Sequence, residues 1–508
     1  MIDKFKKYLR QLSFREYAYF AVQILIFIFV FSFFQSRFTP ILKASEYTHP
    51  GMDDYWMSLG VHETWMNTHS LLKCINRSFI DAVALYKNWD GNILSMFLTG
   101  LTPVAFNENR YHLVFIISFI DLALGAGMVA YSLLHRRWKI SVINCISICL
   151  LFLIFYIDFA PSANEGIYWW PGIANYNLFF GMLLFAQGIF ILYWDRHNIV
   201  WLIISSIVFF LVGLGNPITG LVNVCLLTYE LIYEIYRKKS FKTLYYIPFA
   251  MALTGLLIVI SAPGNSARIV GERLTVFNVI LDSFKYGTIM TKASIKPAFN
   301  IYMIMVALIS FSSFVYSMKD INEKKDIKAD FKKIIETVIY IIMMVCLYYA
   351  AFAPLIYTKC DWYGRVLNTT AFVYYMVMTS INIYVCRTLA YFFVKLISNI
   401  KSDKINIIKT CEVIVSVIAA ITIVISINTL NGSDYYKSGS LARDAEHALT
   451  FQRAQEYDAE RDRIFMQLLD PNVKEVHIGE IPVISFYPYI DEVIDHMEIY
   501  YGKKIIVD

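Results

Sequence analysis

Long apolar runs, separated by short polar or basic segments, dominate the chain. About twenty apolar residues are needed for a helix to cross the hydrocarbon core of a bilayer. Eleven runs approach or reach that length: 17–35, 111–134, 140–160, 176–194, 199–213, 218–236, 244–261, 298–317, 334–354, 366–386 and 410–428. The pattern predicts an all-α polytopic membrane protein with about 11 transmembrane helices.

Two of the segments between these runs are also apolar enough to be structured. Loop 36–110 follows the first run and contains an amphipathic stretch, 93–106, that is expected to lie in the membrane interface. A second interfacial helix is predicted near 277–290. Asp158 lies at the end of an apolar run, where a carboxylate in lipid is costly, so it is expected to face the protein interior.

The end of the chain, 429–508, has a different pattern. Residues 441–469 have the spacing of a charged amphipathic helix. Short strand-like runs follow at 473–478, 481–486 and 504–507. We therefore predict a small C-terminal α/β domain after the transmembrane region, 17–428.

Basic residues give the predicted topology. With the N-terminus in the cytoplasm, the inside segments are 1–16, 135–139, 195–198, 237–243, 318–333 and 387–409. The density of Lys and Arg in these segments is severalfold that in the outside segments, as the positive-inside rule requires. The prediction is a multi-pass protein of the cell membrane with a basic cytoplasmic N-terminus, 1–16, and an extracytoplasmic C-terminal domain.

Composition agrees with this class. The chain of 508 residues is 57% hydrophobic and 17% charged, and its mean hydropathy is +0.51. The net charge of +5 has a topological origin, so it does not indicate nucleic-acid binding. No Cys/His spacing typical of a metal site occurs, and no metal is predicted. Cys74 and Cys360 are the two outside cysteines and could form a disulfide.

The polar residues that could carry chemistry gather on the predicted outer side. Asp53 and Asp54 follow Pro50 and Gly51 in loop 36–110. A carboxylate near an acceptor hydroxyl can act as a general base, and one of this pair is the candidate. The alternative is an Asp-rich turn or a helix N-cap without chemistry. His49, His62 and His69 could join the pair at a metal, although their spacing is more typical of loop histidines.

Other outer segments supply candidate substrate-binding residues. These are Trp89, Asp90, Asn164, Glu165, Trp169, Trp170, Asn265, Arg268, Lys359 and Arg365. The tryptophans suit sugar stacking or interfacial anchoring. The three cations suit a lipid phosphate, because guanidinium groups bind phosphate in a bidentate manner. The alternative is that these side chains extend to lipid headgroups. Because all of these candidate residues lie on the predicted outer side, we expect a composite site at the outer membrane face.

The order and sidedness of four motifs resemble the GT-C superfamily of membrane glycosyltransferases. The motifs are Asp53-Asp54, Trp89-Asp90-Gly91-Asn92, Asn164-Glu165 through Tyr176, and Ala262 through Arg268. More narrowly they resemble a bacterial branch that depends on polyprenyl-phosphate sugars, and the similarity covers about residues 15–370. Asn92 stands where the pattern expects Arg. Gly215-Asn216-Pro217 lacks an expected acidic residue, so the donor contacts do not follow from the motifs alone.

The resemblance implies an inverting sugar transfer at the outer face. Asp53 or Asp54 would deprotonate the hydroxyl of a cell-surface glycan or lipid acceptor, as in the synthesis of a cell-envelope polysaccharide. The polyprenyl phosphate would leave, with its charge offset by Arg268, Lys359 or Arg365. Some relatives use a divalent cation, and nothing in this sequence requires one. The alternatives are a transporter or flippase of lipid-linked saccharide, and a polysaccharide polymerase or ligase.

Overall fold

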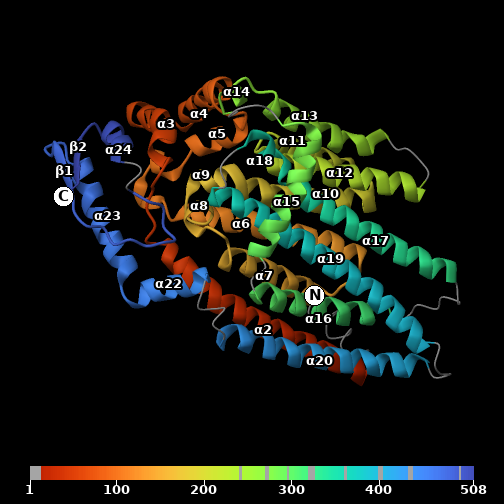
Figure 1. Cartoon of the computed structure of the whole chain (residues 1–508). Coiled ribbons are helices and arrows are strands. Elements are labelled where there is room, and N and C mark those ends of the chain that lie inside the picture. The colour runs from red at the N-terminus through yellow and green to blue at the C-terminus, as the bar shows by residue number, and fades with distance from the viewer. Residues whose placement is uncertain are drawn as a thin grey trace.

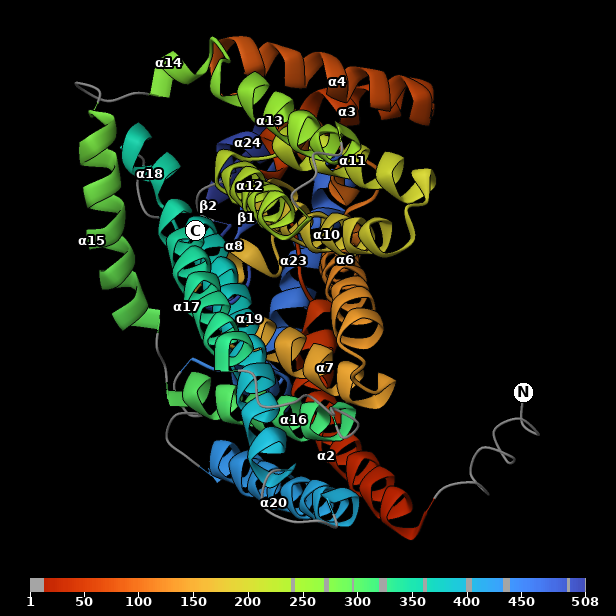
Figure 2. The same ribbon diagram turned by 90° about the vertical axis from the view of Figure 1, so that its right-hand side faces the viewer.

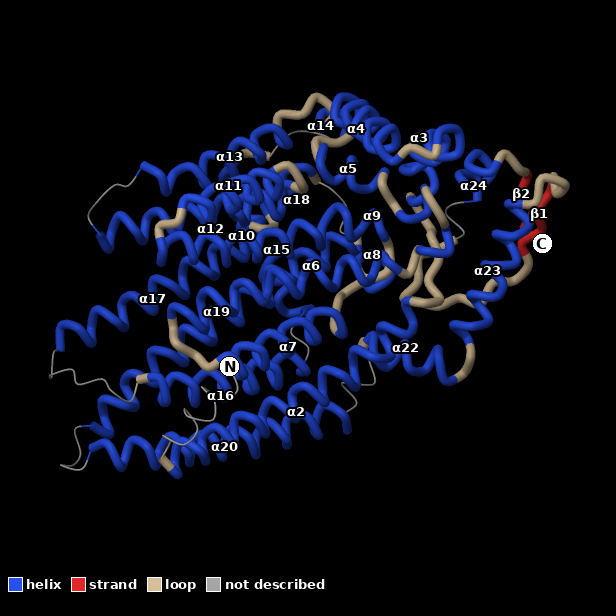
Figure 3. Tube along the Cα trace, turned by 180° about the vertical axis from the view of Figure 1, so that it is seen from behind, coloured by secondary structure: helices blue, strands red, loops and turns tan. Residues whose placement is uncertain are grey.

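The computed structural model of the chain describes residues 13–238, 243–268, 274–294, 297–318, 327–359, 363–398, 404–432, 439–490 and 494–507. Most of this part of the chain is α-helical, and the two short strands lie near its C-terminal end (Figure 3). The long helices run side by side as a bundle (Figure 1). The structure therefore has the all-α architecture expected of a polytopic membrane protein.

By length and composition, eight described helical stretches could cross a membrane. They are built from α2 (Phe14–Ser45), α6 (Leu113–Val129) with η3 (Ala130–Arg137), α9 (Trp170–Gly172) with η4 (Ile173–Asn177) and α10 (Leu178–Arg196), α12 (Pro217–Lys238), α16 (Pro297–Ser317), α17 (Ile327–Ala350) with α18 (Ala353–Thr358), α19 (Gly364–Ser398), and α20 (Lys404–Gly432). Shorter apolar helices are α7 (Val142–Asp158), α11 (Ile199–Gly213) and α13 (Tyr246–Ile260). Each apolar run singled out in the sequence falls on one of these helices.

One end of the bundle is covered by short helices and by the C-terminal segment (Figure 1). The elements there are α3 (Asp54–Thr68), α4 (Leu71–Asn88), α5 (Ile93–Gly100), η1 (Pro103–Ala105), η2 (Glu108–Arg110), α8 (Ala163–Gly166) and α14 (Asn265–Arg268). We call this the cap end. The remaining described helices are η5 (Thr243–Tyr245), at the opposite end of the bundle, and α15 (Val276–Ser294), along its side.

The first helix continues past its predicted end. The run 17–35 stops before polar residues, but α2 extends to Ser45. Arg37 is 2% exposed, and its guanidinium Nη1 lies 3.4 Å from Asp158 Oδ2 on α7. A charge with a buried partner can remain inside a bundle, which hydropathy does not reveal. The expectation that Asp158 faces the protein interior is confirmed.

Asp158 also joins the bundle to the C-terminal segment. Its Oδ1 accepts hydrogen bonds from Ser440 Oγ at 2.7 Å and from the Ala442 amide at 2.8 Å. Asp158→Asn keeps an oxygen for these donors but leaves the charge of Arg37 unbalanced. We expect the free energy of unfolding to fall by about 2 kcal/mol, measured from thermal unfolding in detergent micelles. Unfolding indistinguishable from wild type would show that the Arg37–Asp158 pair adds no stability.

The exposed large apolar side chains of the first loop gather on α4 and not on 93–106, the stretch predicted to lie in the membrane interface. α5, within the predicted stretch 93–106, buries Ser95, Met96, Thr99 and Gly100. The neighbouring α4 lies across the bundle (Figure 2). It exposes five large apolar side chains: Leu71, Leu72, Ile75, Phe79 and Ile80. It packs through small buried side chains, so its large residues point away from the protein. The second predicted interfacial helix, near 277–290, is present as α15 and exposes apolar residues such as Phe277 and Phe284.

The C-terminal segment contains helices and one pair of strands. These are α22 (Leu441–Thr450), α23 (Arg453–Leu469), β1 (Glu475–Ile478), α24 (Ile494–Tyr501) and β2 (Lys504–Val507). β1 and β2 are parallel, with Glu475 opposite Lys504. The predicted single helix 441–469 is wrong, because Gln452 adopts a left-handed conformation with φ of 56° and breaks it. Residues 481–486, predicted as a strand, do not form one. Tyr487, the next residue, is buried.

The C-terminal segment and the first loop share a hydrophobic core. Met52, Tyr55 and Val104 from the loop pack with Ile464 and Val476, and all five side chains are buried. Trp169, from the connection after α8, belongs to the same cluster. The residues around the acidic pair are thus held between the bundle and the C-terminal segment.

Candidate functional site

The backbone that precedes the acidic pair is fixed from three sides. The Gly51 carbonyl accepts a hydrogen bond from Trp169 Nε1 at 3.1 Å, and the Met52 amide donates to the Tyr489 carbonyl at 3.1 Å. A Cβ on Gly51 would lie 2.7 Å from the Tyr489 carbonyl oxygen, so only glycine allows this approach. The acidic pair therefore begins α3 from a defined position.

Asp54 is completely buried at the start of α3. Its Oδ2 accepts hydrogen bonds from Tyr111 Oη at 2.5 Å and from the Gly51 amide at 3.1 Å, and its Oδ1 lies 3.4 Å from Thr102 Oγ1. Burial raises the pKa of Asp54 to about 8, and the hydrogen bonds from Tyr111 and Gly51 oppose this shift. The Asp54 carboxyl group is therefore unexposed and surrounded by three donors.

The raised pKa of Asp54 predicts a pH-dependent stability. The usual pKa of 3.8 rises to about 8 in the folded state, so the native protein keeps a proton that the unfolded chain releases between these values. Stability attributable to Asp54 therefore falls as pH rises through that window, by about 1.4 kcal/mol per pH unit. Asp54→Asn should flatten the pH dependence of the unfolding midpoint across this window. Equal slopes in both proteins would contradict the assignment.

Asp53 differs from its neighbour in exposure and in partners. It is partly exposed, and its Oδ1 accepts a hydrogen bond from Trp56 Nε1 at 2.9 Å. The guanidinium of Arg365 lies near enough for electrostatic interaction with Asp53. Of the two carboxylates, Asp53 is thus the one that can meet a substrate.

Arg365 is paired with Glu165 at the start of α19. Arg365 Nη1 lies 3.0 Å from Glu165 Oε2, and the side chains are 24% and 18% exposed. Glu165 also accepts hydrogen bonds from the amides of Gly364 and Arg365, so it caps the first turn of α19. The guanidinium lies over the rings of Tyr363, at 4.4 Å, and Trp169, at 5.3 Å. Glu165 and the two rings therefore hold Arg365 in one orientation.

The tryptophans after Glu165 are part of the scaffold. Trp169 is 1% and Trp170 is 6% exposed. Trp170 Nε1 donates to the Leu98 carbonyl at 2.9 Å, and its amide donates to Tyr111 Oη at 3.0 Å. Asn164 accepts a hydrogen bond from Ser162 Oγ at 2.7 Å. These side chains fix the loop and leave little ring surface for a sugar.

The motif at the end of α4 is tied to the start of α14. Asn265 Oδ1 accepts a hydrogen bond from the Gly91 amide at 3.0 Å, and Asn265 Nδ2 donates to the Val259 carbonyl at 2.7 Å. Asp90 is 7% exposed and accepts a hydrogen bond from the Asn92 amide. Asn265 and Asp90 are therefore structural residues here.

Lys359, one of the three predicted phosphate-binding cations, has no contact with Asp53 in the described part of the chain. Lys359 is exposed and ends α18 in a left-handed conformation. The side chain of Arg268 lies outside the described residues, as does Cys360, so the possible Cys74–Cys360 disulfide lies outside them as well. Cys74 itself is buried against α3, where its thiol lies 3.8 Å from the Val61 carbonyl oxygen.

The three histidines have separate partners. His49 Nε2 lies 2.9 Å from Asp458 Oδ1, His62 Nδ1 lies 3.2 Å from the Ala105 carbonyl, and His69 ends α3. His49, Asp458 and Asp462 have ligand-type atoms within 4.8 Å of one another. Asp53 does not belong to this group, so the predicted pairing of the histidines with the acidic pair at a metal is not seen in the described residues.

Three residues that the sequence did not single out stabilise this region. Arg461 on α23 is 1% exposed, and its Nη2 donates to the Pro50 carbonyl at 2.8 Å. It lies 3.6 Å from Glu108 Oε1, which also accepts a hydrogen bond from Tyr55 Oη at 3.1 Å. Arg461 and Glu108 lie far apart in sequence, and no local pattern links them.

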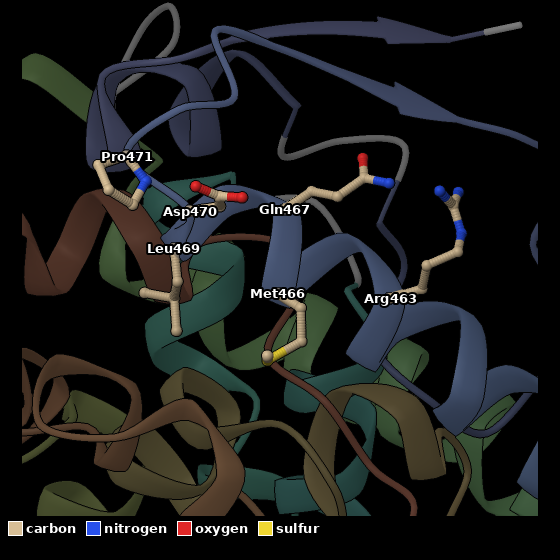
Figure 4. A pocket seen from close by; sticks show the side chains of 6 residues that line it. All are labelled: Arg463, Met466, Gln467, Leu469, Asp470 and Pro471. Carbon is tan, nitrogen blue, oxygen red and sulfur yellow. The ribbon is translucent and has the colours of Figure 1, made fainter.

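Two surface depressions of the C-terminal segment lie apart from these residues. One, of about 560 Å³, is lined by Arg463, Met466, Gln467, Leu469, Asp470 and Pro471 (Figure 4). The other lies between α2 and α22. Arg463 pairs with Glu460 on its own helix, at 2.6 Å, so its guanidinium already has a partner. The candidate site remains the group around Asp53.

A scan of protein-family models and a search of curated proteins found no match to this chain. Function is therefore inferred from the residues and their geometry.

Proposed function

We propose that the protein is a membrane glycosyltransferase that moves a sugar from a polyprenyl-phosphate carrier to a cell-surface acceptor. The observation that supports the proposal is a partly exposed carboxylate, Asp53, that interacts electrostatically with the guanidinium of Arg365, which an ion pair with Glu165 orients at one end of an apolar helix bundle. A carboxylate and a fixed cation at the edge of a bilayer suit an acceptor hydroxyl and a lipid phosphate.

In this mechanism Asp53 accepts the proton of the acceptor hydroxyl. The hydroxyl oxygen attacks the anomeric carbon, and the bond from that carbon to the phosphate oxygen breaks with inversion. Arg365 offsets the charge of the departing polyprenyl phosphate, and Glu165 keeps the guanidinium in place. Asp54 supports the start of α3 and takes no part in proton transfer. The cap end is the extracytoplasmic side in this proposal, and no step requires a metal.

A flippase for lipid-linked saccharide is the principal alternative, and one experiment separates the two. Purified full-length protein is reconstituted in vesicles with radiolabelled polyprenyl-phosphate glucose, mannose, galactose or N-acetylglucosamine. A crude cell-surface polysaccharide serves as acceptor. The proposal expects release of polyprenyl phosphate and label in the polysaccharide. Transbilayer movement of an unaltered donor, without label transfer, would overturn it in favour of the flippase. Transfer from pyrophosphate-linked oligosaccharides alone would favour a polymerase or ligase.

A further inference from the structure

Two tryptophan rings stack on one another beside Asp53. Trp56 and Trp89 stack with their centroids 5.2 Å apart and their planes at 6°. Trp56 lies one turn after Asp53 on α3, and its Nε1 donates the hydrogen bond to Asp53 Oδ1. The ring pair is therefore hydrogen-bonded to the proposed base through Trp56.

The outer ring of this pair is exposed and its backbone is fixed. The side chain of Trp89 is 42% exposed. Its amide donates to the Leu85 carbonyl at 2.7 Å. A Cβ on Gly264 would come within 2.5 Å of the Trp89 amide nitrogen, so the backbone before α14 packs closely against it. An exposed, immobilised tryptophan offers a large binding surface at low entropic cost.

Asp53 has two kinds of neighbour. Arg365, which pairs with Glu165 and lies over Trp169, interacts with Asp53 electrostatically, whereas Trp56 of the stacked ring pair donates a hydrogen bond to it. In an in-line displacement the base contacts the attacking group, and the leaving group departs from the opposite side of the anomeric carbon. Because the leaving phosphate is expected to bind the Arg365 guanidinium, the acceptor is expected to bind at the rings of Trp56 and Trp89.

We propose that Trp56 and Trp89 bind a pyranose ring of a saccharide acceptor, so that the acceptor is a glycan and not a lipid. One apolar C–H face of a pyranose packs on an aromatic ring, while its hydroxyl groups remain free to reach Asp53. This inference rests on the proposed function, since it names the acceptor of that reaction. Anchoring of Trp89 in the bilayer interface is the competing outcome.

Binding is tested without any donor. Full-length protein in lipid nanodiscs is mixed with the methyl glycosides of glucose, galactose, mannose and N-acetylglucosamine, and saturation-transfer NMR reports ring contacts. We expect contact with at least one glycoside, a loss of affinity of about tenfold in Trp89→Ala, and largely restored affinity in Trp89→Phe. Trp201→Phe, in the first turn of α11, is the matched control and should bind as wild type does.

Transfer assays give a second readout. Trp89→Ala should raise the KM for a saccharide acceptor by about tenfold, with a far smaller change in the KM for the donor. Absence of glycoside contact in the wild type, or equal contact in Trp89→Ala, would overturn the saccharide site. Wild-type protein that binds glycosides but consumes no polyprenyl-phosphate sugar would overturn the proposed function instead.

Discussion

Replacement of Asp53 by Asn is expected to lower the kcat of sugar transfer by about a thousandfold, because an amide cannot accept the proton of the acceptor hydroxyl. The hydrogen bond from Trp56 Nε1 survives, since the amide oxygen of Asn accepts it in place of Oδ1. Folding and donor binding should therefore change little. The measurement is the rate of polyprenyl phosphate release at saturating donor and acceptor.

Asp54→Asn is the matched control for this experiment. Both substitutions remove one carboxylate at adjacent positions, but Asp54 is completely buried and bound to Tyr111 and Gly51. We expect Asp54→Asn to keep kcat within severalfold of the wild-type value. Full activity in Asp53→Asn together with inactivity in Asp54→Asn would assign the base to Asp54.

Replacement of Arg461 by Met is expected to lower the free energy of unfolding by about 3–5 kcal/mol. The substitution removes the permanently charged partner of Glu108, which is 4% exposed and keeps only His49 Nδ1, at 3.9 Å, as a potential cation, and it removes the donor to the Pro50 carbonyl. Thermal unfolding of the purified protein measures the change. Because Pro50 lies three residues before Asp53, activity should fall as well.

Two further variants make this test specific. Glu108→Gln in the Arg461→Met background should recover part of the stability, because the uncompensated charge is then absent. Arg463→Met, two residues along the same helix, removes an exposed arginine that pairs with Glu460 and should cost less than about 1 kcal/mol. Equal losses in Arg461→Met and Arg463→Met would show that the buried contact with Glu108 is unimportant.

The sequence predicts the helices better than it predicts the site. Apolar runs mark each long helix because every backbone polar group in a bilayer must be paired within the helix. Hydropathy does not predict the end of α2, because Arg37 is a charged residue. In the structure Arg37 is buried, because it pairs with Asp158, which lies far away in sequence. The break at Gln452 was missed because a left-handed residue there leaves no signal in the spacing of apolar residues.

The candidate site residues fall into two groups, according to the hydrogen-bond and ionic partners of their polar groups. Glu165 pairs with Arg365, and Arg365 interacts electrostatically with Asp53, while Asp90, Trp170 and Asn265 bind nearby backbone groups. Composition cannot separate these roles, because the same residue types serve both. Trp56 is a site residue that the sequence analysis did not single out but could have predicted. A residue three positions after Asp53 lies beside it on a helix, and the Trp56 indole donates to Asp53.

The most direct test of the central claim is a structure of the protein with undecaprenyl phosphate, the product of the proposed reaction. The account predicts the phosphate in contact with the Arg365 guanidinium at the cap end. The opposite end of the bundle offers another cation, Arg137, paired with Asp195 at 3.0 Å. A phosphate bound only there, with Arg365 still held by Glu165 alone, would contradict the account.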